Sequence, residues 1–196
     1  FGFTSDTLDQ WGTVSPTGKT APSLPDIEAA LPAFRGRIQQ IPPMMSALKK
    51  DGVRLYDLAR RGIQVEREAR SITIYKLDIL EYNQQSGDLV LDCACSQGTY
   101  IRTLCDDLGR VLGCGAVMTA LRRTEAAGYT LKDCLTLEAL RELAAEGGLS
   151  RRLLPVESAF YSYPAIRVSS PQATRFRNGG GLSLDRLSSP ISGITR

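Results

Sequence analysis

The chain has 196 residues, 42% of them hydrophobic, and a formal net charge of +3. This length accommodates one full domain and part of another, and the apolar content is sufficient for a packed core. The chain contains no histidine, which excludes Ser-His-Asp triads, Cys-His dyads and histidine-ligated metal sites formed within it.

The predicted elements before residue 80 are short. Ser23, followed by Pro25 and two acidic residues, predicts the start of a helix, and Pro32 is expected to kink or shorten that helix. Asp51-Gly52 is a typical hairpin turn. The other predicted elements are strands at 37–41, 44–49 and 71–80, the last with a slip in register, and a helix at 55–59 that closes at Gly62.

The centre of the chain predicts a strand, a tight turn and a helix. Residues 89–95 alternate in the manner of a strand, which places Leu89, Leu91, Cys93 and Cys95 on one face and Val90, Asp92 and Ala94 on the other. Apolar residues then recur at helical spacing from 101 to 112, with Thr99 as the expected N-cap and Gly113 as the terminating glycine. Arg102 falls in the first helical turn, where a cation is unfavourable. We therefore expect Arg102 to face a carboxylate or a phosphate.

The last third predicts one more strand and one more helix. Residues 116–124 are predicted as a strand, and Thr136 is expected to cap a helix whose buried face is Leu137, Leu140 and Leu143. The composition changes to Pro, Ser and Gly from Tyr163 onward. We place a domain boundary near residue 161, giving an α/β domain with a mixed sheet at 1–160 and a second domain that begins at 161–196.

Residues 35–70 carry nine basic and four acidic side chains. This local excess of positive charge is typical of a surface that faces phosphates. An ordinary solvated face is the alternative.

The cysteines are odd in number and lack paired C-x-x-C spacing. Cys93 and Cys95 fall on one face of a predicted strand, which favours buried thiols over a zinc site. Unpaired cysteines, with no signal peptide or transmembrane run in the sequence, favour the cytoplasm. An unrelated α/β domain in which Cys93 and Cys95 do redox or metal chemistry is an alternative, and thiols with a depressed pKa would support it.

Several segments, taken in order and at their spacing, resemble the TruB family of bacterial tRNA pseudouridine synthases. The resemblance covers about residues 4–187. It is carried by Ala33-Phe34-Arg35-Gly36, Gln40-Ile41-Pro42-Pro43, Ser46-Ala47-Leu48-Lys49, Gly52-Val53-Arg54-Leu55-Tyr56, Ala59-Arg60-Arg61-Gly62, Cys95-Ser96-Gln97-Gly98-Thr99-Tyr100-Ile101-Arg102, Leu108-Gly109 and Leu121-Arg122-Arg123-Thr124.

The resemblance implies a fold and a reaction. The fold is a mixed-sheet catalytic domain followed by a small RNA-binding PUA domain, of which residues 161–196 would be the incomplete beginning. The reaction flips uridine-55 out of the T loop of tRNA and isomerises it to pseudouridine, using one aspartate and neither a metal nor an organic cofactor. The implied partner is the T-arm stem-loop, bound by a monomer.

The resemblance also implies roles for individual residues. Tyr100 contacts the flipped uridine, Arg102 pairs with the catalytic aspartate, and Leu121 closes the pocket on the base. The corresponding structural alternatives are a tyrosine packed at a helix start, a structural ion pair and a core leucine. Lys49, Arg54 and Arg60 are candidate contacts to the RNA backbone, whereas Tyr56 and Gln40 are expected to serve packing and the sheet edge.

The chain departs from the family pattern near its N-terminus. The family's catalytic aspartate lies in a Gly-Thr-Leu-Asp-Pro motif upstream of these segments. Asp6-Thr7-Leu8-Asp9-Gln10 imitates that motif but lacks its glycine and proline, and its spacing fits a later Thr-Asp-Thr-x-Asp stretch of the family. We therefore expect an N-terminally truncated enzyme that is inactive by itself, with the partner aspartate of Arg102 outside the chain. Asp9 as the nucleophile, or a non-catalytic RNA-binding protein, are the alternatives.

Overall fold

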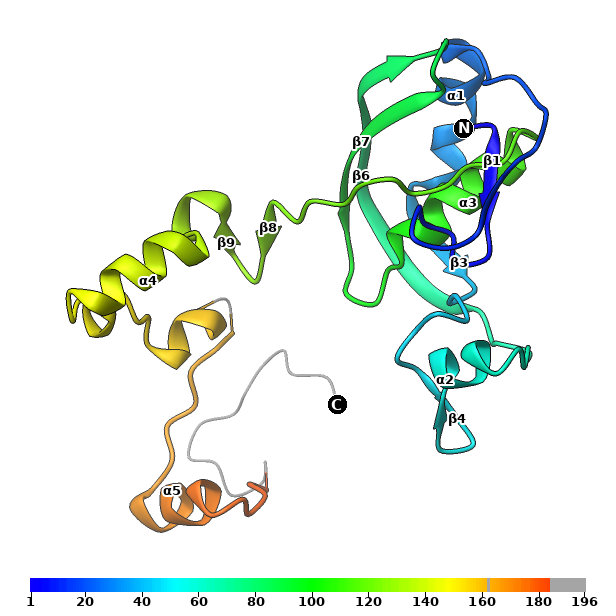
Figure 1. Ribbon diagram of the computed structural model, residues 1–196. Helices are drawn as coiled ribbons and strands as arrows, with labels where there is room; N and C mark the ends of the chain where they lie inside the picture. Colours follow the sequence, from blue (N-terminus) through cyan, green and yellow to red (C-terminus); the bar gives the residue numbers. More distant parts are fainter. Residues whose placement is uncertain (162, 184–196) are drawn as a thin grey trace. The chain divides into compact units, whose positions relative to one another are not determined.

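The computed structural model describes residues 1–161 and 163–183 (Figure 1). The chain divides into two compact units, Phe1–Leu121 and Arg122–Arg196. The predicted boundary near residue 161 does not coincide with this division, and the assignment of 161–196 to a PUA-like domain stays a prediction. Among the described residues, every helix is too short or too polar to span a membrane. The fold is mixed α/β, as predicted.

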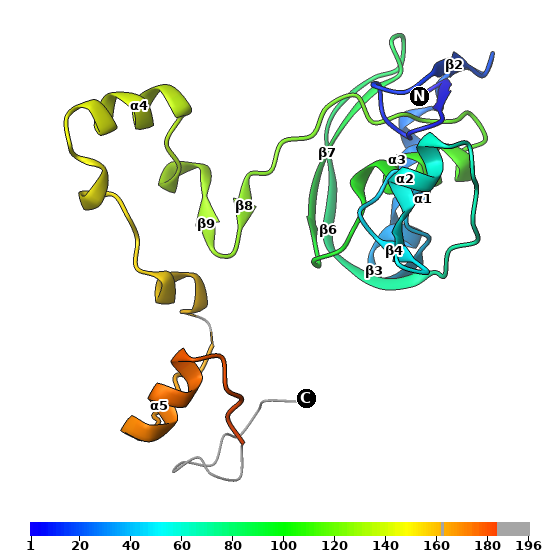
Figure 2. The ribbon, with the colours of Figure 1, turned by 60° about the horizontal axis from the view of Figure 1, so that its bottom comes forward.

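The first unit is built on an antiparallel three-stranded sheet in the order β3-β6-β7. These strands are β3 (Gly36–Gln40), β6 (Arg70–Asn83) and β7 (Asp88–Cys95). Figures 1 and 2 show β6 and β7 as long ribbons that curve around the helices. The pairing of β6 with β7 shifts register at Tyr75 and again at Leu80, and both side chains are exposed. The irregularity at Tyr75 confirms the single slip predicted in this strand, and the one at Leu80 was not predicted.

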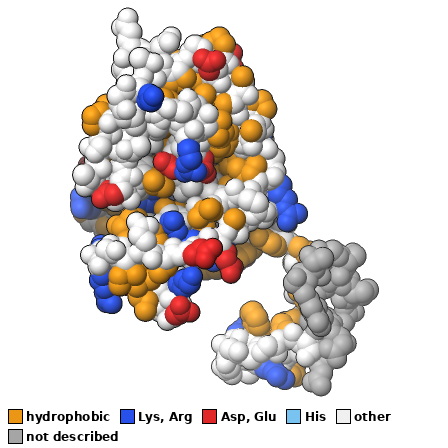
Figure 3. Space-filling view, turned by 90° about the vertical axis from the view of Figure 1, so that its right-hand side faces the viewer, with side chains coloured by type: hydrophobic (Ala, Val, Ile, Leu, Met, Phe, Trp, Pro, Cys, Tyr) orange, Lys and Arg blue, Asp and Glu red, His pale blue; other side chains and the backbone are white. Residues whose placement is uncertain are grey.

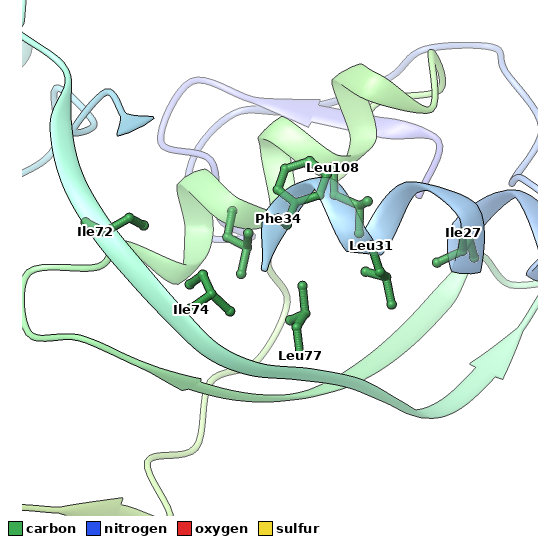
Figure 4. Packing of buried hydrophobic residues seen from close by; sticks show 8 residues of the cluster. Ile27, Leu31, Phe34, Ile72, Ile74, Leu77 and Leu108 are labelled. Carbon is green, nitrogen blue, oxygen red and sulfur yellow. The ribbon is translucent and has the colours of Figure 1, made fainter. Parts of the chain in front are cut away.

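Two helices cover one face of this sheet. They are α1 (Leu24–Ala30), continued by the 3₁₀ turn η1 (Leu31–Phe34), and α3 (Ile101–Val111). Figure 4 shows how their apolar side chains meet those of β6. The buried cluster consists of Ile27, Leu31, Phe34, Ile72, Ile74, Leu77, Leu104 and Leu108. Each of these side chains stabilises the fold by about 1.5–3 kcal/mol through burial.

Helix α1 begins and ends where the sequence predicts. The Ser23 hydroxyl accepts a hydrogen bond from the backbone N–H of Asp26, whose carboxylate accepts one from the backbone N–H of Ser23. Pro32 cannot donate a backbone hydrogen bond, and the α-helix gives way to the 3₁₀ turn at Leu31. The predicted shortening at Pro32 is confirmed.

Two small hairpins complete the first unit. Strands β1 (Phe3–Ser5) and β2 (Val14–Pro16) form one, and β4 (Lys49–Lys50) and β5 (Val53–Arg54) form the other, followed by α2 (Leu55–Arg60). Asp51 and Gly52 both have positive φ angles, of 51° and 81°, which is typical of the predicted hairpin turn. The strand predicted at 44–49 is wrong. The chain turns tightly there, since Ser46 N–H donates to the Met44 carbonyl over 2.8 Å.

The second unit consists of short elements. They are β8 (Glu125–Ala126), β9 (Tyr129–Thr130), η2 (Leu131–Asp133), α4 (Leu137–Ala145), η3 (Leu149–Arg151), η4 (Val156–Phe160) and α5 (Ser170–Arg177). Thr136 caps α4 as predicted, its hydroxyl accepting from Ala139 N–H over 3.2 Å. The predicted buried face of α4 is wrong, because Leu137 is 66% exposed and Leu140 and Leu143 are only partly buried.

The predicted strand at 116–124 is also wrong. Within the described part of the chain, its strand-like pairing is an isolated parallel bridge between Met118 and Asp9.

Candidate functional site

The start of α3 is fixed by the end of the sheet. Ser96 continues the pairing of β7 with β6, because its N–H donates to the Thr73 carbonyl over 2.8 Å and its hydroxyl accepts from Thr73 N–H over 2.9 Å. The Thr99 hydroxyl donates back to the Ser96 carbonyl over 2.9 Å. Thr99 is therefore not the N-cap, which corrects our prediction. Tyr100 occupies that position, with φ −99° and ψ 105°.

Tyr100 is held by a residue from the far strand of the sheet. The Gln40 carboxamide donates to the Tyr100 carbonyl over 3.1 Å and accepts from Tyr100 N–H over 2.8 Å. Gln40 is 3% exposed and is the last residue of β3. A tyrosine side chain cannot cap its own helix in the way that Ser, Thr, Asp or Asn can. Gln40, 60 residues away in the sequence, instead provides an acceptor for the backbone N–H of the N-cap residue itself.

Arg102 lies two residues further along and is held by two acceptors. Its Nη1 is 2.9 Å from Asp9 Oδ2, and its Nη2 donates to the Met45 carbonyl over 2.8 Å. The expectation that Arg102 faces a carboxylate is confirmed. That carboxylate lies within the chain, however, whereas we had placed the partner of Arg102 outside it.

The Asp9 carboxylate is buried and held by several hydrogen bonds. Asp9 is 8% exposed, and its Oδ1 accepts from the Thr7 hydroxyl over 2.6 Å and from Trp11 N–H over 3.2 Å. The neighbouring backbone is held by Met118, which donates to the Leu8 carbonyl and accepts from Gln10 N–H. This pairing places the carboxylate beside Arg102, although 93 residues separate them in the sequence.

The Arg102 guanidinium retains binding capacity. A guanidinium has five N–H donors, and within the described part of the chain Asp9 and Met45 accept from one each. The side chain is 24% exposed. Arg102 can therefore receive a further anion while its orientation is kept by Asp9.

The basic candidates lie in the segment that follows β3. Lys49 and Arg54 are cross-strand neighbours in the β4–β5 hairpin. The guanidinium groups of Arg54 and Arg60 lie 5.7 and 5.3 Å from the ring centre of Tyr56, and Arg54 also donates to the Tyr56 hydroxyl. All three basic side chains are exposed, and among the described residues none pairs with a carboxylate.

The basic segment and the start of α3 are joined by two adjacent residues. The Met45 carbonyl accepts from Arg102, and the Ser46 carbonyl accepts from Tyr56 N–H over 3.1 Å. Figure 3 shows one face of the molecule, on which basic and acidic side chains are scattered among hydrophobic and uncharged ones.

Two family models match the chain in succession. The N-terminal domain of the TruB family pseudouridylate synthases matches residues 1–101, and the tRNA pseudouridylate synthase B C-terminal domain matches residues 102–161. The chain belongs to the TruB family.

Curated proteins named tRNA pseudouridine synthase B support this membership. The relative from Dechloromonas aromatica is 47% identical over 184 residues, covering 93% of this chain and 60% of the relative. The relatives from Ectopseudomonas mendocina and Pseudomonas paraeruginosa are 49% and 46% identical over 181 residues, covering 91% of this chain and 58% and 59% of the relatives. The chain thus spans about three fifths of their length.

A solved structure shares the fold. A chain from the crystal structure of a Cbf5-Nop10-Gar1 complex matches with a TM-score of 0.62 and 24% sequence identity, over 82% of this chain and 46% of that one. At this identity the match shows the fold alone.

The three site residues proposed from the TruB resemblance, Tyr100, Arg102 and Leu121, differ in where they lie and in how exposed they are. Tyr100 and Arg102 lie two positions apart at the start of α3. Leu121 is 61% exposed, which excludes the alternative that it is a core leucine. No local sequence pattern predicts the two hydrogen bonds between Gln40 and Tyr100.

The thiols do not support the redox alternative. Burial, with the neighbouring Cys95 as a second cause, raises the pKa of Cys93 to about 12, and burial raises the pKa of Cys105 to about 11. Reactive thiols have depressed pKa values instead. Within the described ranges, no group of three or more Cys, Asp or Glu side chains is placed to hold a metal ion.

Proposed function

We propose that this chain is part of a tRNA pseudouridine synthase that isomerises uridine-55 in the T loop. The observation that carries the proposal is the Arg102–Asp9 pair, which holds a partly free guanidinium two residues from Tyr100 at the start of α3. The name of the curated relatives, tRNA pseudouridine synthase B, supports the same reaction.

The reaction needs a fixed cation and a surface for the base. The bond between uracil and ribose is cleaved, the base rotates, and a carbon of the base joins the ribose. A carboxylate that assists this cleavage must be ionised, and a cation beside it favours the charged form. We assign this task to the free N–H groups of Arg102. Tyr100 supplies a ring against the flipped base, and exposed Leu121 supplies an apolar cover.

Asp9 serves this site by orienting Arg102. A nucleophilic carboxylate must present a free oxygen to the sugar. The Asp9 oxygens accept from Thr7, Trp11 and Arg102, and the residue is almost fully buried. We therefore assign the nucleophile to a second aspartate, which in the family lies upstream of the segments seen here. No metal and no organic cofactor takes part in this proposal.

RNA binding is assigned to Lys49, Arg54 and Arg60. Flipping a base out of a folded loop costs a few kcal/mol, and contacts to phosphates offset this cost. The three side chains are exposed and lie within one hairpin and the helix that follows it. We propose that they bind the backbone of the T-arm stem-loop, with the protein acting as a monomer.

The test compares two proteins on a T-arm stem-loop RNA. One is the chain as given. The other, the extended chain, is preceded by the N-terminal segment of the Dechloromonas aromatica relative. We expect the chain as given to bind the RNA without turnover and the extended chain to form pseudouridine. Turnover by the chain as given, lost in Asp9→Asn, would make Asp9 the nucleophile. Binding by both proteins with turnover by neither would favour a non-catalytic RNA-binding protein.

A further inference from the structure

We propose that Gln40 is a positioning residue for the reaction, which sets the place of Tyr100 by holding both polar groups of its backbone. The inference rests on the proposed function, because it gives Tyr100 the task of contacting the base. Gln40 itself does not touch the substrate in this proposal.

The geometry shows a two-point attachment. The carboxamide of Gln40 donates to one backbone group of Tyr100 over 3.1 Å and accepts from the other over 2.8 Å. Two bonds in opposite directions fix the orientation of the Tyr100 peptide groups as well as their distance. Because Gln40 ends β3 and is almost fully buried, its own position is set by the sheet.

The hydrogen bonds from Gln40 provide partners for backbone groups at the N-terminus of α3. The first backbone N–H groups of a helix lack partners within the helix, and the N-cap Tyr100 makes no side-chain cap. The Tyr100 carbonyl also accepts the first helical bond, from Leu104 N–H over 3.1 Å. Without Gln40, the Tyr100 N–H loses the partner that the structure gives it, and the helix start can move.

Tyr100 and Arg102 have separate anchors. The Arg102 side chain is held by Asp9 and Met45, whereas Gln40 contacts the backbone of Tyr100. A Gln40 variant should therefore displace Tyr100 while the Arg102–Asp9 pair persists. Misplacement of a substrate-contacting group by about 1 Å costs on the order of 10²-fold in rate.

The first experiment measures kcat and KM in the extended chain. Gln40→Leu, which fills the same space without hydrogen bonds, should lower kcat by about 10- to 100-fold and change KM for the RNA by less than about twofold. Gln40→Glu keeps an acceptor for Tyr100 N–H and should recover part of kcat.

The matched control is Thr17→Val. It removes hydrogen bonds to the carbonyls of Gly2 and Cys114, beyond the other end of α3, and should lower the melting temperature without changing kcat. Equal kcat values in Gln40→Leu and Thr17→Val would overturn the proposal, and so would no recovery in Gln40→Glu.

A second readout uses the chain as given and needs no activity. All tyrosines are replaced by 3-fluorotyrosine, and Tyr100→Phe identifies the Tyr100 signal in the fluorine NMR spectrum. Gln40→Leu should shift or broaden that signal and leave the Tyr82 signal in place. An unchanged Tyr100 signal would overturn the positioning role. A shifted signal, together with an extended chain that forms no pseudouridine, would instead place the failure in the proposed function.

Discussion

The start of α3 and the β4–β5 hairpin with α2 both present arginine side chains, in opposite surroundings. Arg102 is three quarters covered and is held by Asp9 and by a backbone carbonyl. Arg54 and Arg60 are exposed and lie over the ring of Tyr56. The contacts of Arg102 fix the orientation of its guanidinium group. Arg54 and Arg60 instead supply positive charge on the surface. We infer that changes at the start of α3 affect the rate of the reaction, and that changes in the hairpin and α2 affect RNA affinity.

The largest effect is expected from Arg102→Ala in the extended chain. Loss of one preorganised donor at a reacting centre typically lowers kcat by about 10²–10³-fold. RNA affinity should change by less than about twofold, because the proposed partner of Arg102 is a carboxylate. Pseudouridine formation and fluorescence anisotropy of a labelled stem-loop measure the two quantities. Parallel losses in rate and affinity would make Arg102 a phosphate contact.

Asp9→Asn should have the next largest effect. It leaves Arg102 without its charged partner. Arg102 would then lack a carboxylate among the described residues, as Arg54 and Arg60 do. Breaking a buried ion pair costs about 3–5 kcal/mol, and since Arg102 is partly exposed we expect about 2 kcal/mol in the free energy of unfolding, measured by urea denaturation. In the extended chain we expect a kcat loss of about tenfold. Complete inactivation with unchanged stability would identify Asp9 as the nucleophile.

Charge removal in the basic segment should change the salt dependence of binding. Lys49→Ala and Arg60→Ala should each reduce the slope of log K against log salt by about 1, with kcat unchanged. Lys76→Ala is the control, since that exposed lysine is already paired with Asp92 and Asp78. Binding that depends on salt equally in all three variants and the parent would exclude phosphate contacts by Lys49 and Arg60.

At neutral pH the smallest effect is expected from the thiols, because the ionisation of Cys93 changes stability only at alkaline pH. In the folded chain burial holds the pKa of Cys93 near 12, whereas an unfolded thiol ionises near pH 8.5. The native state therefore binds more protons between these values, and stability should fall as pH rises above about 9. Cys93→Ala should reduce this alkaline loss, as followed by thermal unfolding from pH 8 to 11. An identical pH profile in the variant would contradict the burial of this thiol.

Local signals in the sequence predicted much of the fold. The cap at Ser23, the break at Pro32 and the turn at Asp51-Gly52 are each determined by neighbouring residues, and all three are present. The strand predicted at 116–124 failed because an apolar pattern does not show whether another strand runs beside the segment. In the structure its backbone forms an isolated bridge, between Met118 and Asp9.

The site was predicted in part. Arg102 was expected to meet a carboxylate because of its place at a helix start, and it does. The carboxylate belongs to Asp9, which lies 93 positions from Arg102 in the sequence. Gln40 and Tyr100, which are hydrogen-bonded to each other, lie 60 positions apart. Contacts at such separations depend on how the sheet and helices pack, which no single stretch of this sequence specifies.

One measurement tests the difference between the two regions most directly. The single-turnover rate of pseudouridine formation at saturating RNA is compared in the extended chain, its Arg102→Ala variant and the triple variant Lys49→Ala, Arg54→Ala, Arg60→Ala. We predict a parental rate for the triple variant and a loss of about 10²–10³-fold for Arg102→Ala. Equal losses in both variants would contradict the assignment of chemistry to the start of α3 and of binding to the hairpin and α2.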